Sequence, residues 1–348
     1  MVVSVEAARR PDAEQGPDPV EIRRRVLDLS TSAYAFSALT AAFELGILDE
    51  LAVPQTPGEV GRRTAAAEPV VHALLEVLLA LGLVRRVETD RGPAFVSWPS
   101  VGAVASGRAK EFLLGDLRST HYQAADLVER ARRGDIAQEW RHTDPQLLDA
   151  QGVRSADAVA PLSARLFPML EGLSESLERH GAVFLDVGTG VGWLAVEMCR
   201  RFPNLRAVGI DPYETALAHA RRNIALVGLE GRIELRAQPV EELADDRRFD
   251  IAWVPAMFLG HDRAARGLER VFHSLTPGAW ALVASMADEG EELQPAVLRL
   301  IAVQYGGGGL FPEHVAGMLS AAGFADVFVM PPMPGVAIRL TMGRRSAD

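Results

Sequence analysis

Apolar side chains recur with two different spacings along the chain. From 21 to 51 they recur every three or four residues, which predicts one long and one short helix separated near Gly46. Helical spacing returns over 104–180, mainly in 110–133 and 160–180. Beyond that point short β-rich runs alternate with helical patterns. This alternation predicts a parallel sheet with helices on both faces.

Seven short runs in the second half of the chain have the length and composition of β-strands. Helices are expected over 214–227 and 312–322. The last two strands are joined by 331–335, which is too short for a helical crossover, so they should pair antiparallel. The predicted strands are 183–186, 207–211, 233–236, 251–254, 279–285, 327–330 and 337–342.

The first third of the chain has the pattern of a winged helix. Thr56 and Pro57 open a helix, because a threonine hydroxyl caps the first turn and proline is tolerated there. A second helix over 68–81 is followed by strands at 83–87 and 93–98. This second helix lacks the Arg, Lys, Asn and Gln side chains that read base edges, so DNA binding is not expected.

Composition narrows the class of protein. A chain of 348 residues with 48% apolar residues has room for two domains. Its formal net charge of −10 argues against a nucleic-acid partner. The single Cys199 excludes an internal disulfide and a cysteine-built metal site. Neither a membrane span nor a signal peptide is expected, so the predicted location is the cytoplasm.

A glycine-rich turn follows the first of the seven strands. Asp186 ends an apolar run, and Gly188, Gly190 and Gly192 follow at alternate positions. Glycines let the backbone turn tightly and approach a ligand, and the helix N-terminus beyond presents free N–H groups. Asp211 ends the second strand, where a carboxylate accepts hydrogen bonds from ribose hydroxyls. The combination predicts a cofactor that contains a nucleoside.

A dinucleotide is the competing ligand for such a turn. Its fingerprint requires glycine at the first, third and sixth positions. Trp193 occupies the sixth position from Gly188, and the glycines occupy the first, third and fifth. The acidic Asp186 before the first glycine also suits a cationic methionine group better than a pyrophosphate. The turn therefore favours S-adenosylmethionine over NAD.

At these residues the chain resembles the class I S-adenosylmethionine-dependent methyltransferases. Together with the winged helix, it is similar to the small-molecule O-methyltransferases, which include plant caffeate-type and bacterial natural-product enzymes. The resemblance implies an α/β fold with a Rossmann-like seven-stranded methyltransferase sheet behind an all-helical, winged-helix domain. The implied domains are a disordered tail (1–20), a dimerisation domain (21–103), a helical linker with pocket helices (104–180) and the catalytic domain (181–348).

The resemblance also assigns the amino-acid end of the cofactor. It implies that Asp186 lies near the methionine amino group. It implies that Gly188, Gly190 and Gly192 line the same end.

The nucleoside end is assigned in the same way. Asp211 is expected to bind the ribose, although its place before Pro212 also suits a helix N-cap that needs no ligand. Pro212 and Tyr213 are expected near the adenine. Gln238 is expected to accept a hydrogen bond from the adenine amino group through its amide oxygen.

The resemblance places a catalytic base after the fourth strand, in a His-Asp-Trp context. Here His261 and Asp262 are followed by Arg263, and alignment without a gap puts the base position near Met257. His261 is the predicted general base, and a place at a helix N-terminus is its alternative role. Without a base the acceptor would have to be nucleophilic already, as an acidic phenol, an amine or an enolisable carbon is. O-methylation is favoured, and N- and C-methylation stay open.

Aromatic side chains before and after the sheet are the candidates for the substrate pocket. A mostly apolar pocket with few polar groups is usual for a small organic substrate. Each aromatic has a place in the core as its alternative role. The glycines at 306–309 form either a lid or a simple loop. The candidate pocket residues are Tyr122, Trp140, Phe167, Phe258 and Tyr305.

Two other functions fit the same pattern. A relative could bind the cofactor and catalyse another reaction, such as a hydroxylation or a rearrangement. A winged-helix regulator could use the second domain as a ligand sensor, which would require a basic face that helix 68–81 lacks. The prediction is a cytoplasmic homodimeric methyltransferase that uses S-adenosylmethionine on a small, aromatic or polyketide-like molecule of secondary metabolism. No metal, nucleic-acid or membrane partner is expected.

Overall fold

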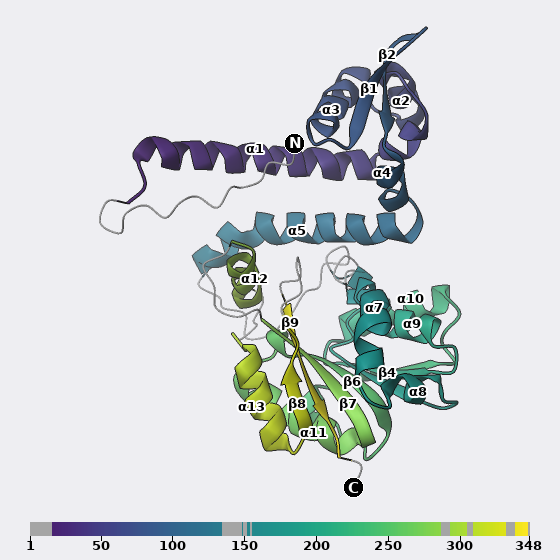
Figure 1. Ribbon diagram of the computed structural model, residues 1–348, viewed down its shortest axis with the longest axis vertical. Helices are drawn as coiled ribbons and strands as arrows, with labels where there is room; N and C mark the ends of the chain where they lie inside the picture. The colour runs from purple at the N-terminus through teal and green to yellow at the C-terminus, as the bar shows by residue number, and fades with distance from the viewer. Residues whose placement is uncertain are drawn as a thin grey trace. The chain divides into compact units, whose positions relative to one another are not determined.

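The chain folds into two units, Met1–His121 and Tyr122–Asp348 (Figure 1). A computed structural model describes residues 16–133, 148, 152–153, 155–286, 293–304, 309–331 and 338–346. Helix α5 (Gly107–Arg133) belongs to both units.

The first unit has the winged-helix pattern expected from the sequence. Helix α1 ends before Gly46, which has a φ of +72° and separates α1 from the short helix η1. Strands β1 and β2 pair antiparallel, with Thr89 opposite Gly92 at the turn. Leu75 of α3 and Phe95 of β2 share one buried core. The elements are α1 (Pro19–Glu44), η1 (Leu48–Ala52), α2 (Pro57–Thr64), α3 (Glu68–Ala80), β1 (Val84–Thr89), β2 (Gly92–Ser97) and α4 (Pro99–Val104).

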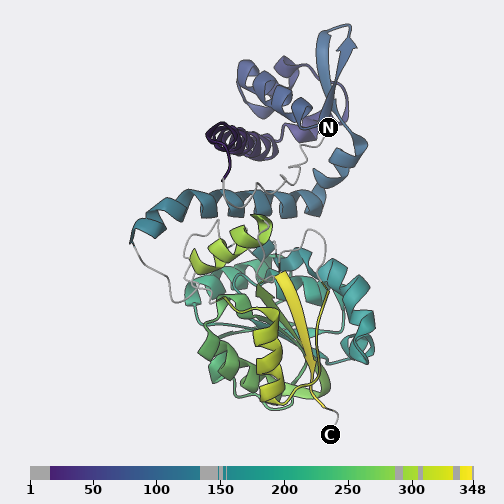
Figure 2. The ribbon, with the colours of Figure 1, turned by 60° about the vertical axis from the view of Figure 1, so that its left-hand side comes forward.

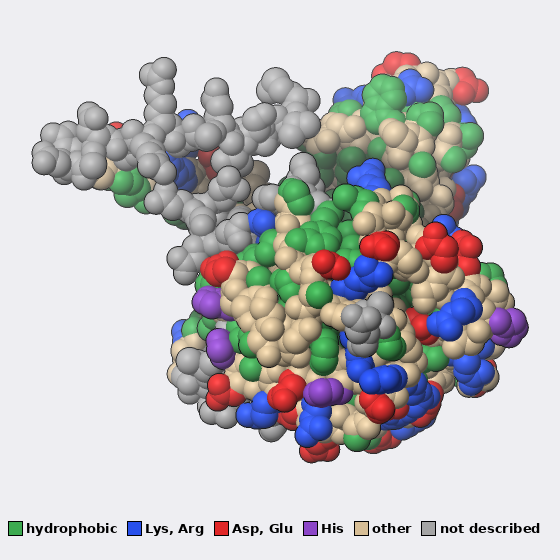
Figure 3. Space-filling view, turned by 60° about the horizontal axis from the view of Figure 1, so that its bottom comes forward, with side chains coloured by type: hydrophobic (Ala, Val, Ile, Leu, Met, Phe, Trp, Pro, Cys, Tyr) green, Lys and Arg blue, Asp and Glu red, His purple; other side chains and the backbone are tan. Residues whose placement is uncertain are grey.

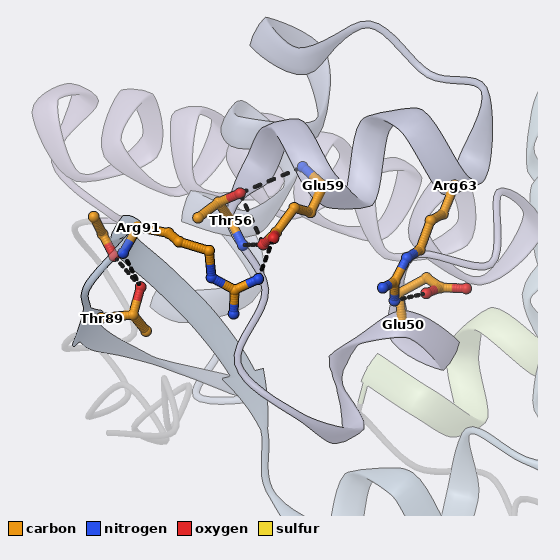
Figure 4. Close-up of polar contacts among 7 residues, drawn as sticks. Glu50, Thr56, Glu59, Arg63, Thr89 and Arg91 are labelled. Atoms are coloured by element: carbon orange, nitrogen blue, oxygen red, sulfur yellow. Dashed lines mark hydrogen bonds and ion pairs between the residues drawn. The ribbon is translucent and has the colours of Figure 1, made fainter.

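Reciprocal hydrogen bonds fix the start of α2. The Glu59 N–H donates to Oγ1 of Thr56 over 3.4 Å, and the Thr56 N–H donates to Oε2 of Glu59 over 2.8 Å (Figure 4). The Thr56 N–H holds the pKa of Glu59 below its usual range. Arg91 in the turn between β1 and β2 forms an ion pair with the same carboxylate, and Arg63 pairs with Glu50 over 2.8 Å. The predicted cap at Thr56 is confirmed, and it also joins α2 to the two-stranded wing.

Helix α1 differs from the sequence-based expectation in two respects. It begins at Pro19 behind an Asp18 cap, so the end of the predicted tail is helical, and residues 1–15 lie outside the described part. By length and composition alone α1 could also cross a membrane, which the sequence analysis did not expect. The mean hydropathy over 18 residues can be high even where polar residues interrupt the apolar run. Its exposed large apolar side chains are Val20, Ile22, Val26, Leu27, Leu29 and Tyr34.

The segment 160–180 is broken, although the sequence pattern predicted one helix. Pro168 cannot donate the helical hydrogen bond, and Leu170 leaves the helical conformation with a ψ of 110°. Gly172 then adopts a φ of +73°, and a new helix starts after it. The pieces are α7 (Val159–Pro161), η2 (Leu162–Leu166), η3 (Phe167–Met169) and α8 (Leu173–Glu178).

A seven-stranded sheet with the order β5-β4-β3-β6-β7-β9-β8 forms the centre of the second unit. Strand β9 is antiparallel to both β7 and β8, and the other neighbouring pairs are parallel. All seven predicted strands are present, with ends shifted by a few residues, and the antiparallel ending is confirmed. The strands are β3 (Val183–Val187), β4 (Arg206–Asp211), β5 (Ile233–Ala237), β6 (Phe249–Pro255), β7 (Leu275–Met286), β8 (Ala325–Val329) and β9 (Ile338–Arg344).

Helices cover both faces of this sheet (Figure 2). Successive residues of β7 alternate between two cores, Trp280 and Leu282 in one and Ala281 and Val283 in the other, as the two-residue period of a strand requires. Helices α9 and α10 contribute to the first core, and α11 and α13 contribute to the second. The remaining elements are α9 (Trp193–Arg201), α10 (Glu214–Leu226), η4 (Val240–Glu242), η5 (Ala256–Phe258), α11 (His261–Ser274), α12 (Leu293–Gln304) and α13 (Pro312–Ala322).

Strand β3 lies where the order of the sheet reverses. The chain first adds β4 and β5 on one side of β3 and then returns to place β6 on the other side. In open α/β sheets, ligands bind at the carboxyl ends of the strands beside such a switch point. The carboxyl end of β3 carries Asp186 and the glycine-rich turn.

Candidate functional site

The turn between β3 and α9 has a backbone that glycine adopts readily and other residues do not. Gly188, Gly190 and Gly192 have φ values of +64°, +54° and +81°. Gly192 is the N-cap residue of α9. A Cβ atom on Gly190 would meet nothing closer than the Gly188 carbonyl oxygen at 3.9 Å, so there is open space beside this glycine. The strand, turn and helix predicted here are confirmed.

Asp186 is almost fully buried, with 1% of its surface exposed. Its Oδ2 accepts a hydrogen bond from the Thr189 hydroxyl over 2.7 Å. Burial raises the pKa of Asp186 to about 7, the Thr189 hydroxyl opposes this rise, and the nearby Asp211 adds to it. At neutral pH both the protonated and the ionised form of Asp186 are therefore populated, and a cationic ligand would favour the ionised form.

Both carboxylate oxygens of Asp211 accept hydrogen bonds from backbone N–H groups. The Gly190 N–H donates to Oδ2 over 3.0 Å, and the Tyr213 N–H donates to Oδ1 over 2.9 Å. Burial raises the pKa of Asp211, and these two hydrogen bonds oppose the rise. The N-cap role considered for Asp211 is wrong, because α10 begins at Glu214 and its N-cap residue is Tyr213; the bond from the Tyr213 N–H instead fixes the turn before the helix. The bond from Gly190 joins the end of β4 to the glycine-rich turn.

A cavity lies at the carboxyl ends of β3, β4 and β6, beside the switch point. Its wall combines backbone of the glycine-rich turn with acidic side chains and with apolar side chains from β6 and η5. The predicted cofactor residues that line it are Asp186, Gly188, Gly190, Asp211, Pro212, Tyr213 and Gln238, and the predicted pocket residue Phe258 lines it as well.

Other predicted site residues lie elsewhere in the described part of the chain. Phe167 belongs to the core, where its ring stacks on Phe202 with centroids 6.2 Å apart. His261 is exposed as the first residue of α11, and its ring centroid lies 6.3 Å from that of His314. Gly192 faces α10. Among the described residues that line the cavity, none of Phe167, His261 and Gly192 is found.

The three other predicted pocket residues are not among the described residues that line the cavity. Tyr122 is half-buried on α5 and is not one of the described cavity-lining residues. Trp140 and Tyr305 lie outside the described residues.

The cavity also contains residues that the sequence pattern did not assign to it. Thr189 comes from the glycine-rich turn, and Trp253 comes from the end of β6, next to the switch point. Arg263 of α11 lines the cavity as well, and its Nε donates to Oε1 of Glu241 over 2.8 Å. The sequence signal for Arg263 was its departure from the family's tryptophan, and the signal for Trp253 was its place at the end of a predicted strand.

Charged side chains on one face of the second unit are of mixed sign. Figure 3 shows basic and acidic groups interspersed over the coloured part of that face. A nucleic-acid backbone requires clustered Lys and Arg side chains, and the described residues on this face do not gather them in a single patch.

Two family models match the chain, one in each unit. An O-methyltransferase dimerisation domain matches residues 27–102, and a methyltransferase domain matches residues 184–278. The second match includes Asp186, the glycine-rich turn and Asp211.

Curated relatives are methyltransferases of different substrate classes. A release factor glutamine methyltransferase of Cereibacter sphaeroides is 32% identical over 176 residues, which are 48% of this chain and 62% of the relative. The N,N-dimethyltransferase OxyT of Streptomyces rimosus is 28% identical over 225 residues, which are 62% of this chain and 64% of the relative. The chain thus spans less than two thirds of the length of these relatives.

The fold itself is found in solved structures. Human N-acetylserotonin methyltransferase in complex with SAM superposes with a TM-score of 0.70 at 19% identity, over 95% of this chain and 99% of that one. This likeness, the order of the two matched domains and the seven-stranded sheet confirm the fold class and the resemblance expected from the sequence. The chain carries a methyltransferase domain behind an O-methyltransferase dimerisation domain, and it resembles the class I S-adenosylmethionine-dependent small-molecule O-methyltransferases that have this domain order.

Proposed function

We propose that the protein binds S-adenosylmethionine in the cavity beside β3 and transfers its methyl group to a small organic molecule. The observation that carries this proposal is the pair of buried carboxyl groups at the switch point. Asp186 and Asp211 lie at the carboxyl ends of adjacent parallel strands and line one cavity together with the glycine-rich turn.

The charges of the cavity suit a cationic ligand. Asp186 and Asp211 are acidic, while the guanidinium of Arg263 is already paired with Glu241. A pyrophosphate would place two negative charges near the two carboxyl groups, which is unfavourable in a buried site. The residues present therefore fit S-adenosylmethionine, whose sulfonium and amino groups are positive, better than a dinucleotide.

Each part of the cavity would hold a different part of that cofactor. Asp186 would accept a hydrogen bond from the amino group, and the open backbone at Gly190 would admit the adjoining chain. Asp211 would hold the ribose, and Gln238 would contact the adenine. When bound, S-adenosylmethionine supplies an electrophilic methyl group attached to a sulfonium.

The chain's own contribution to the reaction is positioning and exclusion of water. Trp253, Pro255, Phe258 and Leu259 give the cavity an apolar wall, which favours desolvation and alignment of the acceptor. The titratable side chains among its described lining residues are Asp186, Asp211, Tyr213 and Arg263. We therefore propose an acceptor that is already nucleophilic near neutral pH, such as an acidic phenol or an amine.

The oxygen acceptor is supported by the match to an O-methyltransferase dimerisation domain, and OxyT is a relative that methylates nitrogen. We propose an aromatic or polyketide-like acceptor of secondary metabolism, handled in the cytoplasm. We also propose that the protein is a homodimer, assembled through the first unit. Support comes from the matched dimerisation domain and from the exposed apolar side chains of α1, which lies largely within the matched residues.

Calorimetric titration of the purified protein tests the cofactor assignment. S-adenosylmethionine and S-adenosylhomocysteine are expected to bind, and NAD is expected not to bind. Turnover is then measured as S-adenosylhomocysteine formed with a panel of phenols and amines of increasing acceptor pKa. Binding of NAD in place of both sulfur compounds would contradict the proposal.

A further inference from the structure

Thr189 is held rigidly in the middle of the glycine-rich turn. Its N–H donates to the Ile210 carbonyl of β4 over 3.0 Å, and its own carbonyl accepts from the Gly192 N–H over 2.9 Å. Only 7% of its surface is exposed. The backbone is thus held on both sides, and the Thr189 hydroxyl donates to Oδ2 of Asp186 over 2.7 Å.

Gly209 makes room for this side chain. It lies within β4, directly opposite Asp186 in the register of the sheet. A Cβ atom on Gly209 would lie 2.7 Å from Oγ1 of Thr189 and 2.9 Å from both its Cβ and Cγ2. A glycine inside a strand weakens it and often marks a close approach of another group. Here the approaching group is the side chain that bonds to Asp186.

We propose that Thr189 is a positioning residue, which uses its hydroxyl to keep the Asp186 carboxyl group ionised and oriented for the positively charged amino group of the cofactor. This inference rests on the proposed function. A hydrogen bond donated to a carboxylate favours its ionised form, and at a buried site this bond opposes the effect of desolvation. Removal of the hydroxyl would therefore leave Asp186 protonated over a wider pH range.

Other groups around Asp186 also influence its ionisation. Asp211 on β4 disfavours ionisation of Asp186, and a backbone contact from Ala195 on α9 favours it. Arg263 on α11 lines the same cavity and is paired with Glu241, and among the described lining residues Tyr213 is the other titratable one. The Thr189 hydroxyl favours ionisation by donating a hydrogen bond to Asp186.

The test compares Thr189→Val, which removes the hydroxyl at nearly constant volume, with Thr189→Ser, which keeps it. Binding is titrated across neutral pH with two ligands. S-adenosylhomocysteine carries the amino group, and 5′-methylthioadenosine lacks the whole amino-acid end. Thr189→Val is expected to weaken binding of S-adenosylhomocysteine about tenfold at neutral pH, with recovery at alkaline pH. Binding of 5′-methylthioadenosine should not change, and Thr189→Ser should restore the wild-type pH profile.

Gly209→Ala provides an independent second variant. Its added methyl group would displace the Thr189 side chain, so it should move the pH profile in the same direction. In an Asp186→Asn background, Thr189→Val should no longer alter the pH profile, because the titrating group is absent.

Two outcomes would overturn the inference. One is an unchanged pH profile of S-adenosylhomocysteine binding in Thr189→Val. The other is an equal loss of both ligands at every pH, which indicates a structural role for Thr189. If the wild-type protein binds neither ligand, the proposed function itself fails, and the inference fails with it.

Discussion

The main-chain N–H of Gly190 donates a hydrogen bond to Oδ2 of Asp211 over 3.0 Å. This bond joins the glycine-rich turn after β3 to the end of β4, so the two strands present their carboxyl ends as one surface. The other oxygen of Asp211 accepts from the Tyr213 N–H. Asp211 thus organises the cavity as well as lining it.

Asp211→Ala is expected to weaken S-adenosylmethionine binding at least tenfold and to lower the free energy of unfolding by about 1–3 kcal/mol, because two backbone N–H groups lose their acceptor. Asp211→Asn keeps an acceptor oxygen and should lose less stability. Titration calorimetry and chemical denaturation measure the two effects separately. Unchanged affinity in the alanine variant would contradict the ribose assignment.

Asp186→Asn is expected to stabilise the ligand-free protein while weakening cofactor binding. The folded-state pKa of about 7 lies above the ordinary value of 3.8, so the stability contributed by protonated Asp186 is complete below pH 3.8 and is lost as pH rises through 7. The neutral amide avoids this loss. The gain in free energy of unfolding should reach at most about 4 kcal/mol above pH 7, and it should vanish as the pH falls toward 3.8.

Denaturant titrations on both sides of neutral pH check this prediction for Asp186→Asn. The Thr189 hydroxyl can still donate to the amide oxygen, so the comparison isolates the charge. A stability difference that does not depend on pH would show that Asp186 does not titrate in this range.

His261→Ala is expected to leave turnover close to that of the wild type. The side chain is exposed and is not found among the described residues that line the cavity. If His261 is the general base instead, kcat should fall by about 10²–10⁴-fold. The measurement is kcat and KM across pH with a phenolic acceptor.

Leu27→Glu is expected to shift the protein from dimer to monomer. Leu27 is an exposed apolar residue of α1 within the matched dimerisation domain, and a buried unpaired charge at an interface is strongly unfavourable. Ser32→Glu is a matched control, because helical spacing places it in one polar stripe with Arg25 and Asp28. Light scattering coupled to gel filtration distinguishes dimer from monomer for both variants. A wild-type monomer would refute the dimer.

The sheet and the glycine-rich turn could be predicted because their signals are local. A buried strand, an acid and glycines at alternate positions determine the backbone near Asp186 almost without reference to the rest of the chain. The break near Gly172 was also marked in the sequence, by Pro168 and by the glycine itself, but apolar spacing across the segment concealed it.

The rest of the site depends on contacts between distant segments. Arg263 lines the cavity because α11 packs against η4, and neither helix reveals that packing in its own sequence. The role proposed for Thr189 depends on the absence of a side chain at Gly209, which lies twenty residues later in β4. Phe167 has the composition of a pocket residue, yet its partner Phe202 places it in the core.

Because Asp186 is buried, binding of the cationic cofactor is coupled to the release of protons. Because burial raises the pKa of Asp186 to about 7, part of the empty molecules carry this proton at neutral pH. A cation selects the ionised molecules, so each binding event at neutral pH releases on average a fraction of a proton to the solution. The heat of binding then includes the ionisation enthalpy of the buffer. The apparent enthalpy will therefore differ between phosphate and Tris at the same pH, while the affinity stays the same.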